Sequence, residues 1–92
     1  MAEFFVYILK SEKSGRHYIG SSSDPDKRLK RHNTNGVVST RNKGPWKIVF
    51  TQEFKTNVEA RQIENKLKKL KRKDIIDRII SDGYIKMKTF GV

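Results

Sequence analysis

The first apolar stretch of the chain, residues 4–9, reads Phe-Phe-Val-Tyr-Ile-Leu and contains no polar alternation. Aromatic and β-branched residues favour strands, and a strand without a polar face must be covered on both sides. Ser14 and Gly15 then form a turn, where glycine can adopt a positive φ, and residues 16–20 return as a second strand. We therefore predict a hairpin whose first strand is central in its sheet.

A short helix is predicted next, from about Pro25 to Asn33. Asp24 or Ser23 can accept hydrogen bonds from the first free N–H groups, and proline suits the first helical position. Residues 34–45 are rich in Thr, Asn, Ser and Gly and predict a loop.

The second half of the chain predicts one strand and two helices. Residues 46–54 form the third strand, and the Thr56 and Glu59 pair has the spacing of a capping box that opens a helix reaching about Arg72. Residues 74–81 form a last short helix, which Gly83 ends. The apolar positions expected to be buried on these helices are Ala60, Ile63, Leu67, Leu70, Ile75, Ile76, Ile79 and Ile80.

These elements follow the order β-β-α-β-α-α in 92 residues, which is enough for one domain with a modest core. The first and third strands are apolar on both sides, so helices must cover both faces of the sheet. We predict an α/β (α+β) fold with a small three-stranded central sheet, spanning residues 1–92 as a single domain. The sequence after Gly83 is mixed and predicts no element.

Charge and composition narrow the function. Lys and Arg number 21 against 10 Asp and Glu, which gives a net charge of +11 and attracts polyanions, nucleic acid above all. The absence of cysteine excludes disulfides, thiolate metal sites and cysteine nucleophiles. The N-terminal apolar run is too short for a signal peptide or a membrane span, so we expect a cytoplasmic protein that does not bind membranes.

Two triplets on the predicted hairpin suggest a family. They read Val6-Tyr7-Ile8 and Tyr18-Ile19-Gly20, and Arg28 follows on the next helix. Together with Glu64 on the helix after the third strand, this ordered set resembles the GIY-YIG nuclease superfamily over residues 4–73. Within that family the chain is similar to small single-domain bacterial members related to the UvrC-type excision endonuclease catalytic domain. Val6 departs from the motif, since it stands where the family has glycine.

The resemblance implies a catalytic set and a cofactor. Tyr7 and Tyr18 would orient or deprotonate the attacking water, and the sequence leaves open which of them is the base. Arg28 would stabilise the charge of the transition state, and His32, one helical turn later, matches a histidine often seen there. Glu64 would hold one Mg²⁺ or Mn²⁺ ion, which can bind through a single carboxylate with waters and a substrate phosphate. No organic cofactor is implied.

Each of these residues also has an ordinary structural interpretation. The tyrosines could be common strand residues, Arg28 a surface arginine, and His32 a partner of the helix dipole. Glu64 could pair with Lys68 at i, i+4, although helix geometry places it beside the buried stripe and near the sheet. A PD…ExK nuclease motif can also be read, from Asp26 to Lys66, but both of its pieces lie on predicted helices rather than on a strand pair.

The resulting hypothesis is a metal-dependent endonuclease acting on DNA, in repair or recombination. A protein partner would supply targeting, since the chain has no room for a separate targeting domain. Two alternatives remain: a non-catalytic DNA- or RNA-binding module with the same fold, and a basic structural protein. The basic residues expected to contact nucleic acid are Arg16, Lys27, Arg31, Lys66, Lys68, Lys69, Lys71 and Arg72.

Overall fold

The computed structural model describes residues 4–34, 44–70 and 72–85. Its three strands are β1 (Phe4–Ser11), β2 (His17–Ser22) and β3 (Trp46–Phe54), arranged in the order β2-β1-β3. Both neighbours pair with β1 in the antiparallel sense. The apolar first strand is therefore central, as its composition predicts, and β2 lies at an edge of the sheet.

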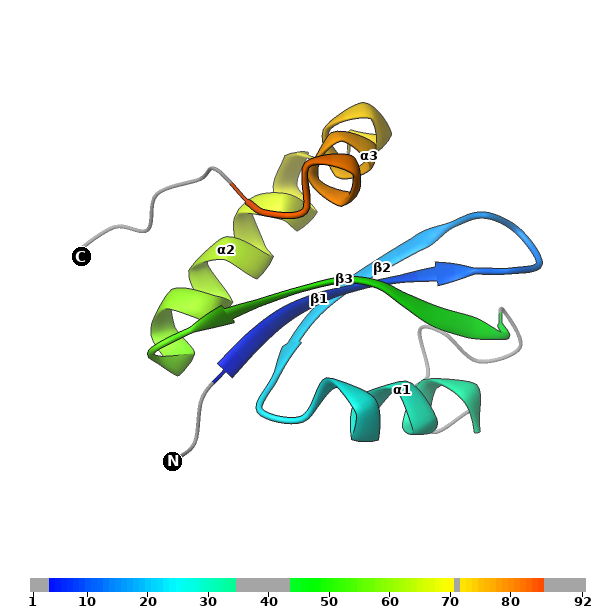
Figure 1. Ribbon diagram of the computed structural model, residues 1–92, viewed down its shortest axis with the longest axis horizontal. Coiled ribbons are helices and arrows are strands. Elements are labelled where there is room, and N and C mark those ends of the chain that lie inside the picture. Colours follow the sequence, from blue (N-terminus) through cyan, green and yellow to red (C-terminus); the bar gives the residue numbers. More distant parts are fainter. Residues whose placement is uncertain (1–3, 35–43, 71, 86–92) are drawn as a thin grey trace.

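Helices cover both faces of this sheet, which confirms the predicted architecture. Helix α1 (Pro25–Asn33) lies against one face, and α2 (Asn57–Leu70) and α3 (Lys73–Asp82) lie against the other (Figure 1). The predicted caps form. The Asp24 carboxylate accepts the Lys27 N–H at 3.1 Å, the Thr56 hydroxyl accepts the Glu59 N–H at 3.1 Å, and Gly83 adopts a φ of 82°.

The two faces of β1 belong to two different cores. Val6 and Ile8 pack with α2 and α3 in an entirely apolar cluster, whose buried members also include Phe50, Ala60, Ile63, Leu67, Ile76, Ile79 and Ile85. Tyr7 and Leu9 point to the other face and pack with Trp46, beside the partly buried Tyr18, Leu29 and Ile48. Alternation along one strand thus separates an apolar core from an aromatic one.

Three details differ from expectation. Leu70 is 39% exposed, because it is the last residue of α2, and Ile76 and Ile79 of α3 complete the core instead. Ile75 and Ile80 are half-buried at the margin of that core. Ile85 is buried although its segment predicted no element, and its N–H donates to the Gln52 side chain at 2.6 Å. The predicted loop lies mostly outside the described residues, at 35–43.

Candidate active site

The candidate site lies at the free edge of β2. Along this strand Ile19 packs into the apolar core beneath α2, whereas Tyr18 packs into the aromatic core on the side of α1. Side chains from opposite faces of a sheet are separated by the sheet itself, except at an edge, where both helices can reach around the last strand. The strand order β2-β1-β3 therefore decides that residues of α1 and α2 can meet here.

Arg28 and Glu64 do meet, in a small polar pocket of about 400 Å³. Arg28 comes from α1 and Glu64 from α2, so the two helices on opposite faces of the sheet contribute to one cavity. The side chains that line this pocket are Ser21, Arg28, Arg61, Glu64 and Asn65. Glu64 is the only carboxylate among them.

The Glu64 carboxylate is fixed from two sides. Its Oε1 accepts a hydrogen bond from the Ser21 hydroxyl at 2.5 Å, and its Oε2 lies 2.6 Å from Lys68 Nζ. The side chain is 17% exposed, so it stands beside the sheet, as the helix geometry predicts. The i, i+4 ion pair with Lys68 forms as well. Glu64 therefore both pairs with Lys68 and lies beside the sheet, so the two expectations for this residue do not exclude each other.

Tyr7 lies directly beneath the edge strand and is fully buried. Its hydroxyl is 3.2 Å from His32 Nε2, and the tautomer of the imidazole decides which of the two donates. Gly20 is the residue opposite Tyr7 in the β1–β2 ladder. A Cβ on Gly20 would lie 2.5 Å from the Tyr7 hydroxyl oxygen, so the last glycine of the second triplet leaves room for the first tyrosine.

Burial shifts the titration of both members of this pair. Loss of hydration raises the pKa of Tyr7 above 10.0, although a hydrogen bond and positive charge from Arg28 act in the opposite direction. Loss of hydration also lowers the pKa of His32 below 6.5, and the cations Arg28 and Arg31 lower it further. Both side chains are therefore neutral near pH 7. His32 serves as a buried partner of Tyr7, not as a charged partner of the helix dipole.

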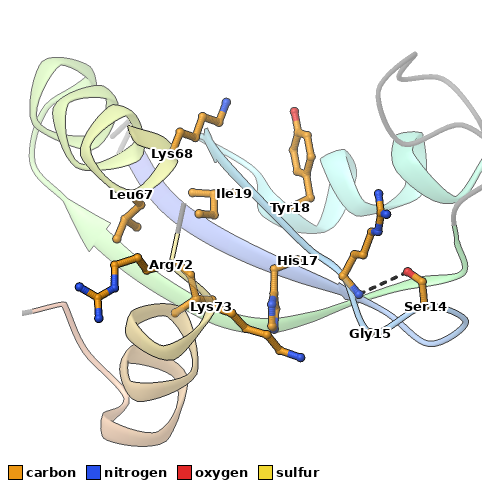
Figure 2. A pocket seen from close by; sticks show the side chains of 11 residues that line it. Ser14, Gly15, His17, Tyr18, Ile19, Leu67, Lys68, Arg72 and Lys73 are labelled. Atoms are coloured by element: carbon orange, nitrogen blue, oxygen red, sulfur yellow. Dashed lines mark hydrogen bonds between the residues drawn. The ribbon is translucent and has the colours of Figure 1, made fainter. Parts of the chain in front are cut away.

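Tyr18 has a different environment, because it is only partly buried. Its ring centroid is 4.6 Å from that of His32, and Lys68 Nζ lies 5.7 Å from the ring centre on the other side of the site. Lys68 and Tyr18 point the same way beyond β2, with Ile19 between them (Figure 2). Tyr18 is therefore the tyrosine that solvent can reach without a rearrangement.

The predicted nucleic-acid contacts fall into three groups. Arg16, Lys68 and Arg72 line a second, larger pocket of about 480 Å³, and Lys68 contacts Glu64 of the first. Lys27, Arg31 and Lys69 are exposed and Lys66 is half-buried, and these four line neither of the two pockets. Lys71 lies outside the described residues.

The sequence did not single out Ser21, Arg61 or Asn65. Arg61 precedes Glu64 by three positions, so helix periodicity places it on the same side of α2 and could have identified it. Ser21 follows the second triplet and alternates with Gly20, which assigns it to the face covered by α2. Val6, where the motif has glycine, is fully buried in the apolar core, so packing accommodates the departure.

The site also offers oxygen atoms of the kind that bind a hard divalent cation. The first pocket brings a carboxylate, a hydroxyl and an amide together, and oxygen ligands of this kind suit Mg²⁺. Among the described residues no group of three or more His, Cys, Asp or Glu side chains gathers to hold a metal, so Glu64 would act as a single protein carboxylate. No helix in the described part of the chain is long and apolar enough to cross a membrane.

Comparison with known proteins places this arrangement in a family. The model of the GIY-YIG catalytic domain matches residues 3–77. The UPF0213 protein CPE1444 of Clostridium perfringens is 37% identical over 87 residues, which are 94% of this chain and 91% of that protein. The solution NMR structure of the UPF0213 protein BH0048 of Bacillus halodurans matches with a TM-score of 0.55 and 33% identity, and covers 88% of this chain and 86% of that one.

Larger proteins match as well. The SLX1 protein of Meyerozyma guilliermondii, a structure-specific endonuclease subunit, is 45% identical over 73 residues. These residues are 71% of this chain but only 25% of the fungal protein, so the chain spans about a quarter of that relative's length. The family match covers both triplets, Arg28 and Glu64. The chain therefore belongs to the GIY-YIG family of nuclease catalytic domains.

Proposed function

We propose that this protein is a metal-dependent endonuclease that hydrolyses phosphodiester bonds in DNA. One observation carries the proposal: Arg28 and Glu64, from helices on opposite faces of the sheet, share one pocket at the free edge of β2. A cation and a carboxylate in such a pocket provide a place for a phosphate and a ligand for a metal ion. The net charge of +11 supports an anionic substrate.

Glu64 would hold the metal, Mg²⁺ or Mn²⁺, with Ser21 orienting the carboxylate through its hydroxyl. When bound, a divalent ion supplies positive charge at the phosphate and lowers the pKa of water. Lys68 donates to the second carboxylate oxygen, so any cation that binds there competes with its ammonium group. A phosphate placed beside Lys68 would offer the ammonium another partner and would ease this competition.

The remaining residues act on charge and on water. Arg28 is positioned to stabilise the negative charge that develops on the phosphate oxygens in the transition state. Tyr18 has access to solvent, so we assign to it the orientation or deprotonation of the attacking water. Tyr7 is buried with a raised pKa, so it stays protonated and acts through its contacts with His32 and Arg28. Tyr7 and His32 are thus positioning residues.

A non-catalytic nucleic-acid-binding module is the second candidate, and the ion pair of Glu64 with Lys68 favours it. This pair satisfies the carboxylate without a metal, as a structural role would require. The fungal relatives are named as subunits, which supports a partner that supplies targeting. A role in DNA repair or recombination and a cytoplasmic location stay predictions.

The test is cleavage of supercoiled, branched and single-stranded DNA with Mg²⁺ or Mn²⁺. Glu64→Gln keeps the size and helix propensity of the side chain, so the fold should survive. Cleavage should fall roughly a thousandfold, since no second carboxylate in the pocket replaces the ligand. DNA binding should stay equal or become tighter, because one negative charge facing phosphate is lost.

Two further variants sharpen this test. Glu12→Gln removes an exposed carboxylate in the hairpin turn and should cleave like wild type. Arg28→Ala should slow turnover and slightly weaken binding, because it removes a cation near the phosphate. Cleavage by Glu64→Gln at the wild-type rate would show that Glu64 does not hold the metal. Tight binding by a wild-type protein that cuts no substrate would favour the non-catalytic module.

A further inference from the structure

The larger pocket, of about 480 Å³, combines an apolar floor with a basic rim. It lies where the β1–β2 hairpin meets the junction of α2 and α3, and Figure 2 shows several of its side chains. Ile19, Leu67 and Ile76 form the apolar part. The residues that line it are Ser14, Gly15, Arg16, His17, Tyr18, Ile19, Leu67, Lys68, Arg72, Lys73 and Ile76. Its volume lies in the range of small-molecule sites.

The charge around this pocket has one sign. Four cations line it and no carboxylate does. Two of them already have partners, since Lys68 pairs with Glu64 and Arg72 pairs with Asp74 at 2.9 Å. Arg16 and Lys73 are exposed, and within the described part of the chain neither forms an ion pair. These two side chains can therefore bind an anion without giving up an existing partner.

The pocket lies next to the candidate active site, because an ion pair joins a residue of one to a residue of the other. Lys68 and Tyr18 line it, and Lys68 Nζ is also 2.6 Å from the Glu64 carboxylate. A DNA strand with its scissile phosphate between Arg28 and Glu64 would thus bring a neighbouring nucleotide to Lys68 and then to the larger pocket. Both pockets are lined by residues of β2, Tyr18 and Ile19 in the larger one and Ser21 in the smaller one, so they lie in succession along this edge strand.

We propose that this pocket holds an unpaired nucleotide next to the scissile phosphate, a proposal that rests on the nuclease function. A DNA duplex presents phosphates and sugars to a protein surface and hides the faces of its bases in the stack. An apolar floor with a tyrosine ring matches the face of a base, and Arg16 and Lys73 match its phosphate. Both parts of the pocket are occupied only when the base is unpaired.

The experiment measures binding in EDTA, so that no cleavage occurs. The ligands are a blunt duplex and the same duplex with a short single-stranded overhang, each carrying a fluorescent label for anisotropy. Wild type should bind the overhang duplex about tenfold more tightly, the effect expected for one stacked base. Arg16→Ala/Lys73→Ala should lose this preference. Lys47→Ala/Arg78→Ala removes the same charge from exposed positions outside the pocket and should keep it.

A second measurement reports the base itself. With 2-aminopurine as the first unpaired base, emission should fall when wild type saturates the overhang duplex, because stacking quenches it. Unchanged emission would overturn the proposal, since only phosphates would then be bound. Equal weakening of both ligands by both double variants would overturn it as well. Thermal unfolding midpoints verify that each variant is folded.

The outcomes separate this proposal from the nuclease function. A wild-type protein that cuts DNA with Mg²⁺ but binds both duplexes equally would leave the nuclease standing and remove the nucleotide pocket. A protein that binds the overhang duplex more tightly in EDTA and quenches its 2-aminopurine emission, but cuts no DNA with Mg²⁺ or Mn²⁺, would support the nucleotide pocket and contradict the nuclease function.

Discussion

The two faces of the sheet differ in what they bury. The face under α2 and α3 is covered by a cluster of nine buried residues, all of them apolar. The face under α1 buries Tyr7 and Trp46 together with His32, which is 1% exposed. Polar side chains cost free energy when they lose water, so a small domain buries them only with partners. The first face supplies stability, and the second places chemistry next to the edge strand.

The comparison explains why the site lies at β2 and not at β3. On the α1 face, Tyr7 and His32 hold each other beneath the edge strand, while Tyr18 and Arg28 lie closer to solvent. The apolar face contributes Glu64 and Lys68 from the side of α2 that borders its core. Each face alone holds only part of the set. Substitutions on the two faces can therefore distinguish their roles: those in the apolar core should change stability more, and those on the α1 face should change turnover more.

The largest expected effect on stability comes from the apolar face. Ile63 is fully buried in that core, and Ile63→Ala should lower the free energy of unfolding by about 2–5 kcal/mol. The turnover of the folded fraction should stay close to wild type, since the residue does not line either pocket. Urea unfolding measures the first quantity, and cleavage at low temperature the second. A fall in turnover as large as that of Glu64→Gln would contradict the separation of the faces.

Gly20→Ala tests the point where the second face touches the edge strand. The new Cβ would lie 2.5 Å from the Tyr7 hydroxyl oxygen, so the ring must move or the strand must shift. Overpacking of this kind should cost about 1–3 kcal/mol and should displace Tyr7 from His32. Stability and turnover should fall together, as seen by urea unfolding and cleavage. Ser22→Ala, in the same strand, is the control: it loses the exposed hydrogen bond that the Ser22 hydroxyl accepts from the Asp24 N–H, so stability should fall only slightly and turnover should stay close to wild type.

Much of this fold followed from periodicity and caps alone. The apolar run of β1 predicted a central strand, and Asp24, Thr56 and Gly83 fixed three helix boundaries. Local rules worked because neighbouring residues determine caps and strand faces. These local rules did not predict the exposure of Leu70 or the burial of Ile85. Burial at the end of a helix and beyond it depends on which residues pack there from elsewhere in the chain.

The candidate site shows the same difference between what the sequence identified and what depends on tertiary packing. The resemblance identified Arg28 and Glu64, and the structure brings them into one pocket. It did not reveal the difference between Tyr7 and Tyr18, since burial follows from strand order and from the helices above each face. Ser21 and Arg61 were missed for a related reason. They have no chemistry of their own in the motif and gain importance only through contact with Glu64 or the pocket around it.

Tyr7→Phe should affect turnover more than stability. It removes one hydroxyl from a buried pair, and a typical hydrogen bond contributes about 0.5–1.5 kcal/mol to folding. Turnover should fall about tenfold or more, because His32 and Arg28 both lose a partner that holds them at the site. The pattern is the reverse of that for Ile63→Ala. Urea unfolding and single-turnover cleavage measure the two changes, and a variant with wild-type turnover would remove Tyr7 from the site.

The smallest expected effect is the dependence of stability on pH, which involves one histidine on each side of the sheet: His32 in α1 and His17 near α3. Burial lowers the pKa of His32 below its ordinary 6.5, helped by Arg28 and Arg31, so the folded protein resists protonation there. As pH falls below about 6.5 the unfolded chain takes up a proton first, and stability decreases until the lower folded pKa is reached. His17 has a pKa shifted in the same direction by burial, Lys10 and Lys73, while Asp77 opposes the shift. Asp74, whose pKa lies below 3.8, does not titrate above pH 5.

Thermal unfolding between pH 8 and pH 5 measures this effect. The wild-type midpoint should be level above pH 7 and should fall by a few degrees toward pH 5. The histidine of each variant no longer contributes to the pH dependence of stability. His32→Gln and His17→Gln should therefore each show a shallower fall of the midpoint than wild type.

His32→Gln should also slow cleavage at pH 8, where the imidazole is neutral, because Tyr7 loses its partner on the α1 face. His17→Gln should slow cleavage less than His32→Gln does, since His17 lines the larger pocket near Asp77 of α3 and lies away from the Tyr7–His32 pair. Equal effects of the two variants on cleavage would show that burial of a histidine, and not its contact with Tyr7, determines turnover.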